Sequence, residues 1–304
     1  MANSPIITSL TDYVVENRMP VISVATLGSK SARVMEHMAG VKGSEAINVI
    51  SSEVAFGNGD ACGWNEAGAS TLSQRVLHTG AVKINMAFCD KVLRKKWAGQ
   101  ELEIKAGLEK LPFAEKFYAS IVDGVQSALE TAIWQGDTSS STNNLKYFDG
   151  LLKIIAADVT NTETIAAGST YIKAVQQTLL AIPTKALKED TVIFCAPEFL
   201  RNYEQALVSA NLYHFEPGKD VDDITIPGSN VKLVAVEGLA GQKHLVAGRL
   251  SNFVYGFDIE DASEYLNAWY SQDNQEFRVN MWFNAGVQIA FPDEIVYATY
   301  TTLA

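Results

Sequence analysis

Apolar side chains recur every four residues through the middle of the chain, which is a helical pattern. The run consists of Phe113, Phe117, Ile121, Val125, Leu129 and Ile133. It opens at Pro112 and closes before Gly136, residue types that favour the first turn of a helix and the position after its last turn. The pattern predicts a helix over residues 112–135. The residues that we expect at the core of this helix are Phe117, Ile121, Leu129 and Trp134.

The apolar stripe of this helix does not run straight. Four residues turn a helix by about 400°, so a stripe with a period of four winds around the helix axis. We therefore expect the two ends of the helix to contact different partners. Phe117 should pack against the part of the chain that precedes the helix, and Trp134 against the domain that follows it.

Residues 46–88 have a strand-like pattern instead. Two segments rich in β-branched residues, INVISSEVAF and RVLHTGAVKINMAF, flank a loop rich in Gly, Asn, Asp and Ser. This pattern predicts a long two-stranded excursion with a broad tip. An isolated hairpin is marginally stable in water, and the chain offers no adjacent third strand. We therefore expect a neighbouring subunit to support this loop.

The rest of the chain mixes shorter helical and strand-like segments. Helical patterns cover 6–18, 31–39, 169–182 and 198–210, and strand-like patterns cover 148–159, 191–196 and most of the chain after 232. Residues 19–28 contain Pro20 and several β-branched residues, which favour extended chain. Since helices and strands do not alternate regularly, the sequence predicts an α+β fold.

Charge and composition narrow the functional classes. The 304 residues are 47% hydrophobic, which is enough for a large core, and the net charge of -11 is the wrong sign for wrapping nucleic acid. The dense basic cluster Lys91, Arg94, Lys95 and Lys96 fits a solvated helix face, a contact with an acidic neighbouring subunit, or a contact with nucleic acid. No run of about 18 uncharged apolar residues occurs, and no Lys or Arg precedes the first apolar stretch, so we expect neither a membrane span nor a signal peptide.

Sequence motifs for catalysis and cofactor binding are absent. Gly57, Gly59 and Gly63 have the wrong spacing for a dinucleotide-binding loop. The four histidines are scattered, and the aspartates of 220–223 lack the Gly and the terminal Glu of a calcium loop. Three cysteines form no CxxC pair, which favours a reducing compartment. We therefore predict no catalytic residue, no metal site and no cofactor. The candidates for intersubunit contacts are Asn58, Asp60, Trp64, Arg75, His78, Arg94 and Lys95.

The order of these segments resembles that of the major capsid proteins of tailed bacteriophages, which have the Hong Kong 97-like fold. The resemblance covers nearly the whole chain and rests on the joint order of several stretches. These are GVKGSEAINVISSEVAF, DACGWNEAGAS, VKINMAFCDKVLRKKW, PFAEKFYASIVDGVQSALETAIWQGD, FDGL and VKLVAVEGLAGQKHLVAGRLSNFVYGFD. No single stretch is as specific as a set of metal ligands.

The resemblance implies four structural parts. They are an N-terminal arm (1–45), an extended loop (46–88), a peripheral domain with a long spine helix (89–167 and 251–304) and an axial domain (168–250). It also implies pentamers and hexamers that form an icosahedral head, assembled in the host cytoplasm and located in the virion. The implied partners are further copies of the chain, scaffolding, portal and decoration proteins, and double-stranded DNA packaged without sequence-specific binding. No membrane is implied.

Three rival functions remain open at the level of sequence. An encapsulin-like shell would use the same fold to enclose a cargo enzyme. A soluble enzyme would be a single particle, and a sugar-binding or host-attachment β protein would be a monomer or trimer.

Overall fold

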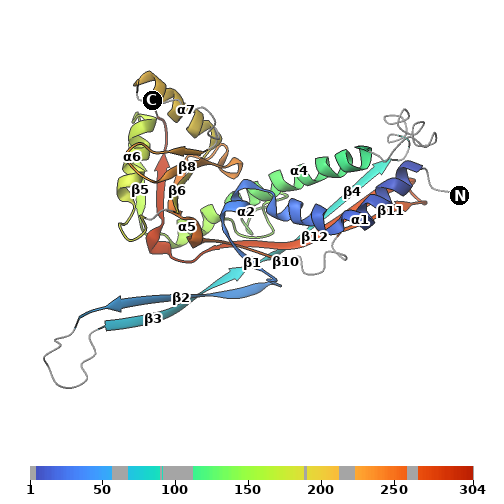
Figure 1. Ribbon diagram of the computed structural model, residues 1–304, viewed down its shortest axis with the longest axis horizontal. Coiled ribbons are helices and arrows are strands. Elements are labelled where there is room, and N and C mark those ends of the chain that lie inside the picture. The colour runs from blue at the N-terminus through green and yellow to red at the C-terminus, as the bar shows by residue number, and fades with distance from the viewer. Residues whose placement is uncertain are drawn as a thin grey trace, which may run out of the picture.

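The computed structural model describes residues 5–56, 68–89, 91, 112–187, 190–211, 223–258 and 266–303. The molecule is elongated and has three parts (Figure 1). A mixed helix and sheet body forms one end, a layer of two long helices over a sheet forms the other, and a two-stranded hairpin extends away from both. The predicted α+β fold class is confirmed.

Helix α4, Pro112–Gln135, has the bounds predicted from the sequence. Ile121, Leu129 and Trp134 are buried, and Phe117 is partly buried against the same core. The two ends contact different partners, as the winding stripe predicts. The Phe117 ring lies 4.8 Å from that of Phe88, whereas the Trp134 ring lies 5.1 Å from that of Phe194 in the other sheet.

The segment before the hairpin differs from its prediction. Helix α1 spans Pro5–Leu27 and includes residues 19–28 almost entirely, which the sequence predicted as extended chain. The helix breaks at Asn17, whose φ of -121° is not helical, and restarts. Pro20 therefore lies in the first turn of the second half, where a missing N–H costs no hydrogen bond. Residues 31–39 divide between helix α2, Lys30–Val34, and strand β1, Glu36–Ala39.

A five-stranded sheet forms the long half of the molecule. Its strands are β1, β4 (Gly80–Cys89), β10 (Phe253–Asp258), β11 (Leu266–Ser271) and β12 (Glu276–Ile289). Strands β10 and β11 lie end to end along one edge of β12, and β4 pairs with the other edge. Helices α1 and α4 cover one face of this sheet (Figure 1).

A six-stranded sheet forms the body at the other end, in the order β5-β13-β9-β6-β8-β7. The strands are β5 (Thr162–Ile165), β6 (Thr191–Cys195), β7 (Asp223–Thr225), β8 (Lys232–Ala235), β9 (His244–Arg249) and β13 (Val296–Tyr300). Helices α5 (Leu151–Asp158), α6 (Tyr171–Ala181) and α7 (Pro197–Ser209) accompany it. One hydrophobic core runs from this body into the long half.

Two strand predictions are wrong in detail. Residues 148–159, predicted as strand-like, contain helix α5, whose Leu151 and Ile155 are buried four residues apart. The hairpin consists of β2, Ser44–Val54, and β3, Gly68–His78, and does not continue to residue 88. Strand β4 belongs to the five-stranded sheet because its inward-facing apolar side chains cover the core. The four-part domain division stays a prediction.

Candidate assembly interface

The hairpin β2–β3 has an exposed apolar face. Ile50 lies directly opposite Leu72 in the register, so the two side chains share a face, and they are 63% and 77% exposed. Val54 and Val76 extend the same face and are 79% and 42% exposed. Exposed aliphatic side chains on a long two-stranded ribbon are unfavourable in water and mark a surface that a partner covers.

The apolar face of this hairpin is free of carboxylates in its described part. Glu45 lies an odd number of residues from Ile50 along β2, so its side chain points to the opposite face. Besides its aliphatic side chains, the apolar face carries Asn48, whose Oδ1 accepts a 2.8 Å hydrogen bond from Gln74 Nε2. A partner could cover this face around Ile50 and Leu72 without burying a charge.

Leu77 anchors the hairpin to the body of the subunit. Its side chain is fully buried in a small cluster with Val41 and Val254. Gly256 on β10 makes room for it, because a Cβ at Gly256 would lie 2.5 Å from Leu77 Cδ2. Gly286 on β12 lets the backbone at His78 approach, since a Cβ there would lie 2.2 Å from the His78 carbonyl oxygen. The base of the hairpin is therefore packed as closely as a protein core.

Arg75, two residues before Leu77 on β3, also holds the hairpin to the subunit. Its guanidinium forms an ion pair with Asp158 at the end of α5 and donates a 3.2 Å hydrogen bond to Gln288 Oε1. Gln288 Nε2 in turn donates a 2.8 Å hydrogen bond to the carbonyl oxygen of Val76. These contacts lie within one subunit, so Arg75 sets the direction of the hairpin. Its predicted role between subunits stays a prediction.

Of the other predicted contact residues, the structure describes one. His78 is exposed at the end of β3, next to the anchor Leu77. Five further candidates lie outside the described residues: Asn58, Asp60, Trp64, Arg94 and Lys95. The sequence reasoning did not find Leu77, Gly256 or Gly286, because a single leucine and scattered glycines in strands carry no distinctive pattern.

A charged cluster fixes the loop that lies beneath the hairpin base. Lys153 Nζ contacts Asp137 Oδ1 at 2.7 Å and Asp149 Oδ1 at 2.6 Å. The hydrogen bond from Lys153 lowers the pKa of Asp137. Partial burial acts to raise the pKa of Asp149, but hydrogen bonds from Lys153 and Thr138 outweigh it, and the pKa falls. Both carboxylates are thus charged near neutral pH, and the pairs are partly exposed and individually weak.

Replacing the anchor tests how the hairpin is held. We expect Leu77→Ala to lower the free energy of unfolding by about 2 kcal/mol, at the lower end for buried leucines because its cluster is small. Leu72→Ala on the same strand is the matched control, and its effect should stay within about 0.5 kcal/mol because the side chain is exposed. Urea unfolding of the single subunit measures both. Equal effects would contradict the anchor.

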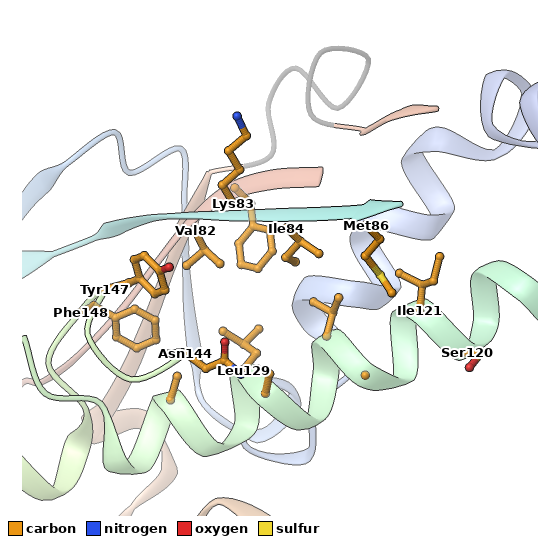
Figure 2. A pocket seen from close by; sticks show the side chains of 15 residues that line it. Val82, Lys83, Ile84, Met86, Ser120, Ile121, Leu129, Asn144, Tyr147 and Phe148 are labelled. Atoms are coloured by element: carbon orange, nitrogen blue, oxygen red, sulfur yellow. The ribbon is translucent and has the colours of Figure 1, made fainter. Parts of the chain in front are cut away.

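A groove lies between strand β4 and helix α4, with a cavity of about 290 Å³ (Figure 2). Val82, Ile84 and Met86 point from β4 toward the helix, while Lys83 points away. The helix contributes Ile121 and Leu129 together with the small residues Gly124, Ala128 and Ala132, and Tyr147 and Phe148 close one end. The groove is apolar, and within the described part of the chain no strand pairs with the outer edge of β4.

The described residues contain no cluster of three or more His, Cys, Asp or Glu side chains that could hold a metal ion. None of the helices in the described ranges is long and apolar enough to cross a membrane.

No protein-family model and no curated protein matches the chain. Solved structures do. The satellite phage P4 procapsid, whose structure includes a size determination protein, matches with a TM-score of 0.66 and 11% identity, over 94% of this chain and 91% of that one. A structure from Gordonia phage Cozz matches with a TM-score of 0.61 and 11% identity, over 90% of this chain and 87% of that one. The structure of a virus-like particle from Pyrococcus furiosus matches with a TM-score of 0.52 and 7% identity, over 93% of this chain and 98% of that one. At such identities the likeness establishes a shared fold, along nearly the whole length of each chain.

Proposed function

The chain has the Hong Kong 97-like fold of tailed-phage capsid proteins, and from this premise we propose that it is the subunit of a closed protein shell, the major capsid protein of a tailed phage. One observation carries the proposal beyond the fold. The hairpin projects from the body with a rigid base and an uncovered apolar face. On a single subunit such a surface promotes aggregation, and it becomes a specific contact when a neighbouring subunit covers it.

The uncovered face of the hairpin suggests how the subunits assemble. A hairpin that covers a different surface of the next copy makes a heterologous contact, which closes into rings when the rotation allows. We propose that these rings are pentamers and hexamers and that hairpins tie them into an icosahedral shell. In this proposal residues 1–45 are the arm, 168–250 face the ring axes, and Asn58, Asp60, Trp64, His78, Arg94 and Lys95 contact neighbouring subunits.

The proposed content of the shell is consistent with the charge of the chain. The net charge of -11 supports the proposal that the shell encloses double-stranded DNA without binding specific sequences. An acidic protein wall repels the DNA phosphates and so does not hold the DNA in place. Scaffolding, portal and decoration proteins complete the proposed assembly, with a virion location and assembly in the host cytoplasm.

An encapsulin-like shell around a cargo protein is the second candidate. The likeness to the virus-like particle from Pyrococcus furiosus supports it, over nearly the whole of both chains. The two kinds of particle differ in what they contain. A phage head holds nuclease-protected DNA, whereas a cargo shell holds protein.

Electron microscopy of the purified chain tests the proposal. We expect closed shells of uniform diameter, or ring-shaped oligomers where a scaffold is missing, together with rapid sedimentation. Single subunits at high concentration, with or without a scaffold from the same source, would contradict a shell function. Protected DNA in particles from the native source distinguishes a phage head from a cargo shell.

A further inference from the structure

The five-stranded sheet has a second face, which points away from helices α1 and α4 (Figure 1). Lys83 belongs to this face, since its side chain points away from α4 (Figure 2). The base of the hairpin covers one end of the face, at Gly256 and Gly286. Along β4, β11 and residues 276–282 of β12, the side chains that share this face are exposed or partly exposed. We call this part the open face.

Three rows of side chains cross the open face, and the strand register fixes their order. Directly paired residues of an antiparallel sheet point to the same side. The rows are Trp269 with Arg278, then Asn267 with Asn280 and Asn85, then Trp282 with Lys83. The open face therefore carries a row of amides that is flanked on each side by an indole and a cation.

A hollow of about 400 Å³ lies on the open face, and its described lining contains two cations and no carboxylate. Arg278 forms an ion pair of 3.3 Å with Glu276, which shares the face but does not line the hollow. Asp258, at the other end of the same face, is only 2% exposed. Lys83 has no ion pair or hydrogen bond with another described residue. The hollow therefore attracts an anionic group, with Lys83 as its unpaired cation.

Two amides of the hollow are held in place by each other. Asn280 Nδ2 donates a hydrogen bond to Asn85 Oδ1. Asn85 Nδ2 and Asn280 Oδ1 make no hydrogen bond with a described residue, so one donor and one acceptor remain for a ligand. The hydroxyl groups of a sugar ring can both donate and accept, and they match such a pair.

The indoles add apolar contact area at two separated points. Trp269 is 44% exposed and Trp282 is 38% exposed. An indole is large and rigid, so it gives contact area at a low cost in conformational entropy. Trp269 is paired with Arg278, four residues from Trp282 along β12, which separates the two indoles by roughly 14 Å along the strand. A ligand that covers both is longer than a single sugar ring.

From this arrangement we propose that the open face binds an acidic polysaccharide. Its sugar rings pack on Trp269 and Trp282, its hydroxyls bond to Asn85 and Asn280, and a carboxylate pairs with Lys83. The binding site is a property of the subunit, and it stays accessible after assembly. The proposal therefore goes beyond the shell function and does not depend on it.

The same residues fit other occupants less well. A nucleic acid strand brings one phosphate for every nucleotide, whereas the open face offers one unpaired cation. The apolar face of a hairpin from a second copy would bury the amides of Asn85 and Asn280 without giving them hydrogen-bond partners, which is unfavourable. A chain of hydroxyl-bearing rings with occasional carboxylates satisfies the amides, the indoles and Lys83 together.

Calorimetric titration of single subunits at low ionic strength tests the site, with alginate oligosaccharides as the acidic probe and dextran of equal length as the neutral one. We expect alginate to bind more tightly than dextran. Trp269→Ala and Asn85→Asp should each weaken alginate binding by about ten-fold or more, because the first removes a platform and the second adds a repelling carboxylate. Tyr147→Ala is the matched control, since Tyr147 is 38% exposed and lines the groove behind β4. It should leave binding unchanged.

A second variant serves where Trp269→Ala or Asn85→Asp does not fold in circular dichroism. Lys83→Gln keeps the length of an exposed side chain and should weaken the binding of alginate but not that of dextran. Absence of alginate binding, or equal losses in Trp269→Ala and Tyr147→Ala, would overturn the proposal.

Two further results would assign the open face to another occupant and overturn the proposal as well. Tighter binding of single-stranded oligothymidylate than of alginate would indicate a nucleic-acid site. Alginate binding by single subunits that assembled shells lack would show that a neighbouring copy covers the face. All of these outcomes leave the shell function standing, because that function is tested by assembly alone.

Discussion

Replacing residues 48–74 with Asn-Gly abolishes closed shells while the subunit still folds. Ile47 and Arg75 are directly paired at the two ends of the deletion, so a two-residue turn can join them. Asn-Gly favours the type I′ turn that closes such a hairpin. Because this variant keeps Arg75 and Leu77, the contacts that hold the base of the hairpin remain in place.

The physical reason is that the removed segment contributes little to its own subunit. Val49 is the one residue of the hairpin's described part in the deletion that is buried, whereas Ile50 and Leu72 are mostly exposed. The thermal midpoint of the variant should therefore stay close to that of the unmodified subunit. Without the hairpin, no apolar projection crosses to the neighbouring subunit.

Sedimentation and negative-stain microscopy measure the outcome, under conditions in which the unmodified chain assembles. Single subunits or isolated rings are the expected products. A control variant, Ser73→Ala, changes the other face of the same hairpin and should assemble normally. Intact shells from the shortened chain would show that the hairpin does not join the subunits.

The sequence predicts the long helix well because two independent signals agree there. The apolar period places α4, and Pro112 and Gly136 mark its ends. The hairpin is predicted in kind but not in extent. Alternating apolar residues continue through β3 and β4, and alternation alone does not tell which strand is the partner. The pairing of β4 with β12 joins segments some 200 residues apart, which local pattern does not encode.

The errors at α1 and α5 have a common cause. Both segments are rich in aliphatic and β-branched residues, which favour strands in isolation. In the folded chain their buried side chains meet the core at helical spacing, such as Val21, Ile22 and Ala25 in the second half of α1. Tertiary packing therefore decides the outcome over local propensity. The groove at Gly124 was also out of reach, because it forms only where β4 and α4 meet.

Trp134 is the residue whose removal should cost the subunit most. Its side chain is fully buried where the cores of the two halves meet, and its ring contacts Phe194. A Cβ at Gly238 would lie 2.3 Å from Trp134 Cδ1, so the backbone there packs directly on the ring. The indole Nε1 donates a 2.7 Å hydrogen bond to Ser31 Oγ, and the Ser31 hydroxyl donates to buried Glu130.

Trp134→Ala should lower the free energy of unfolding by about 3 to 5 kcal/mol, because it leaves a cavity and removes a donor from a buried polar group. That loss is a large share of the roughly 5 to 15 kcal/mol that stabilises a typical domain. Trp134→Phe retains an aromatic ring and should cost less. Trp282→Ala is the matched control, since that indole is 38% exposed. Denaturant unfolding of single subunits gives all three values, and equal losses for Trp134→Ala and Trp282→Ala would contradict the burial of Trp134 between the two halves.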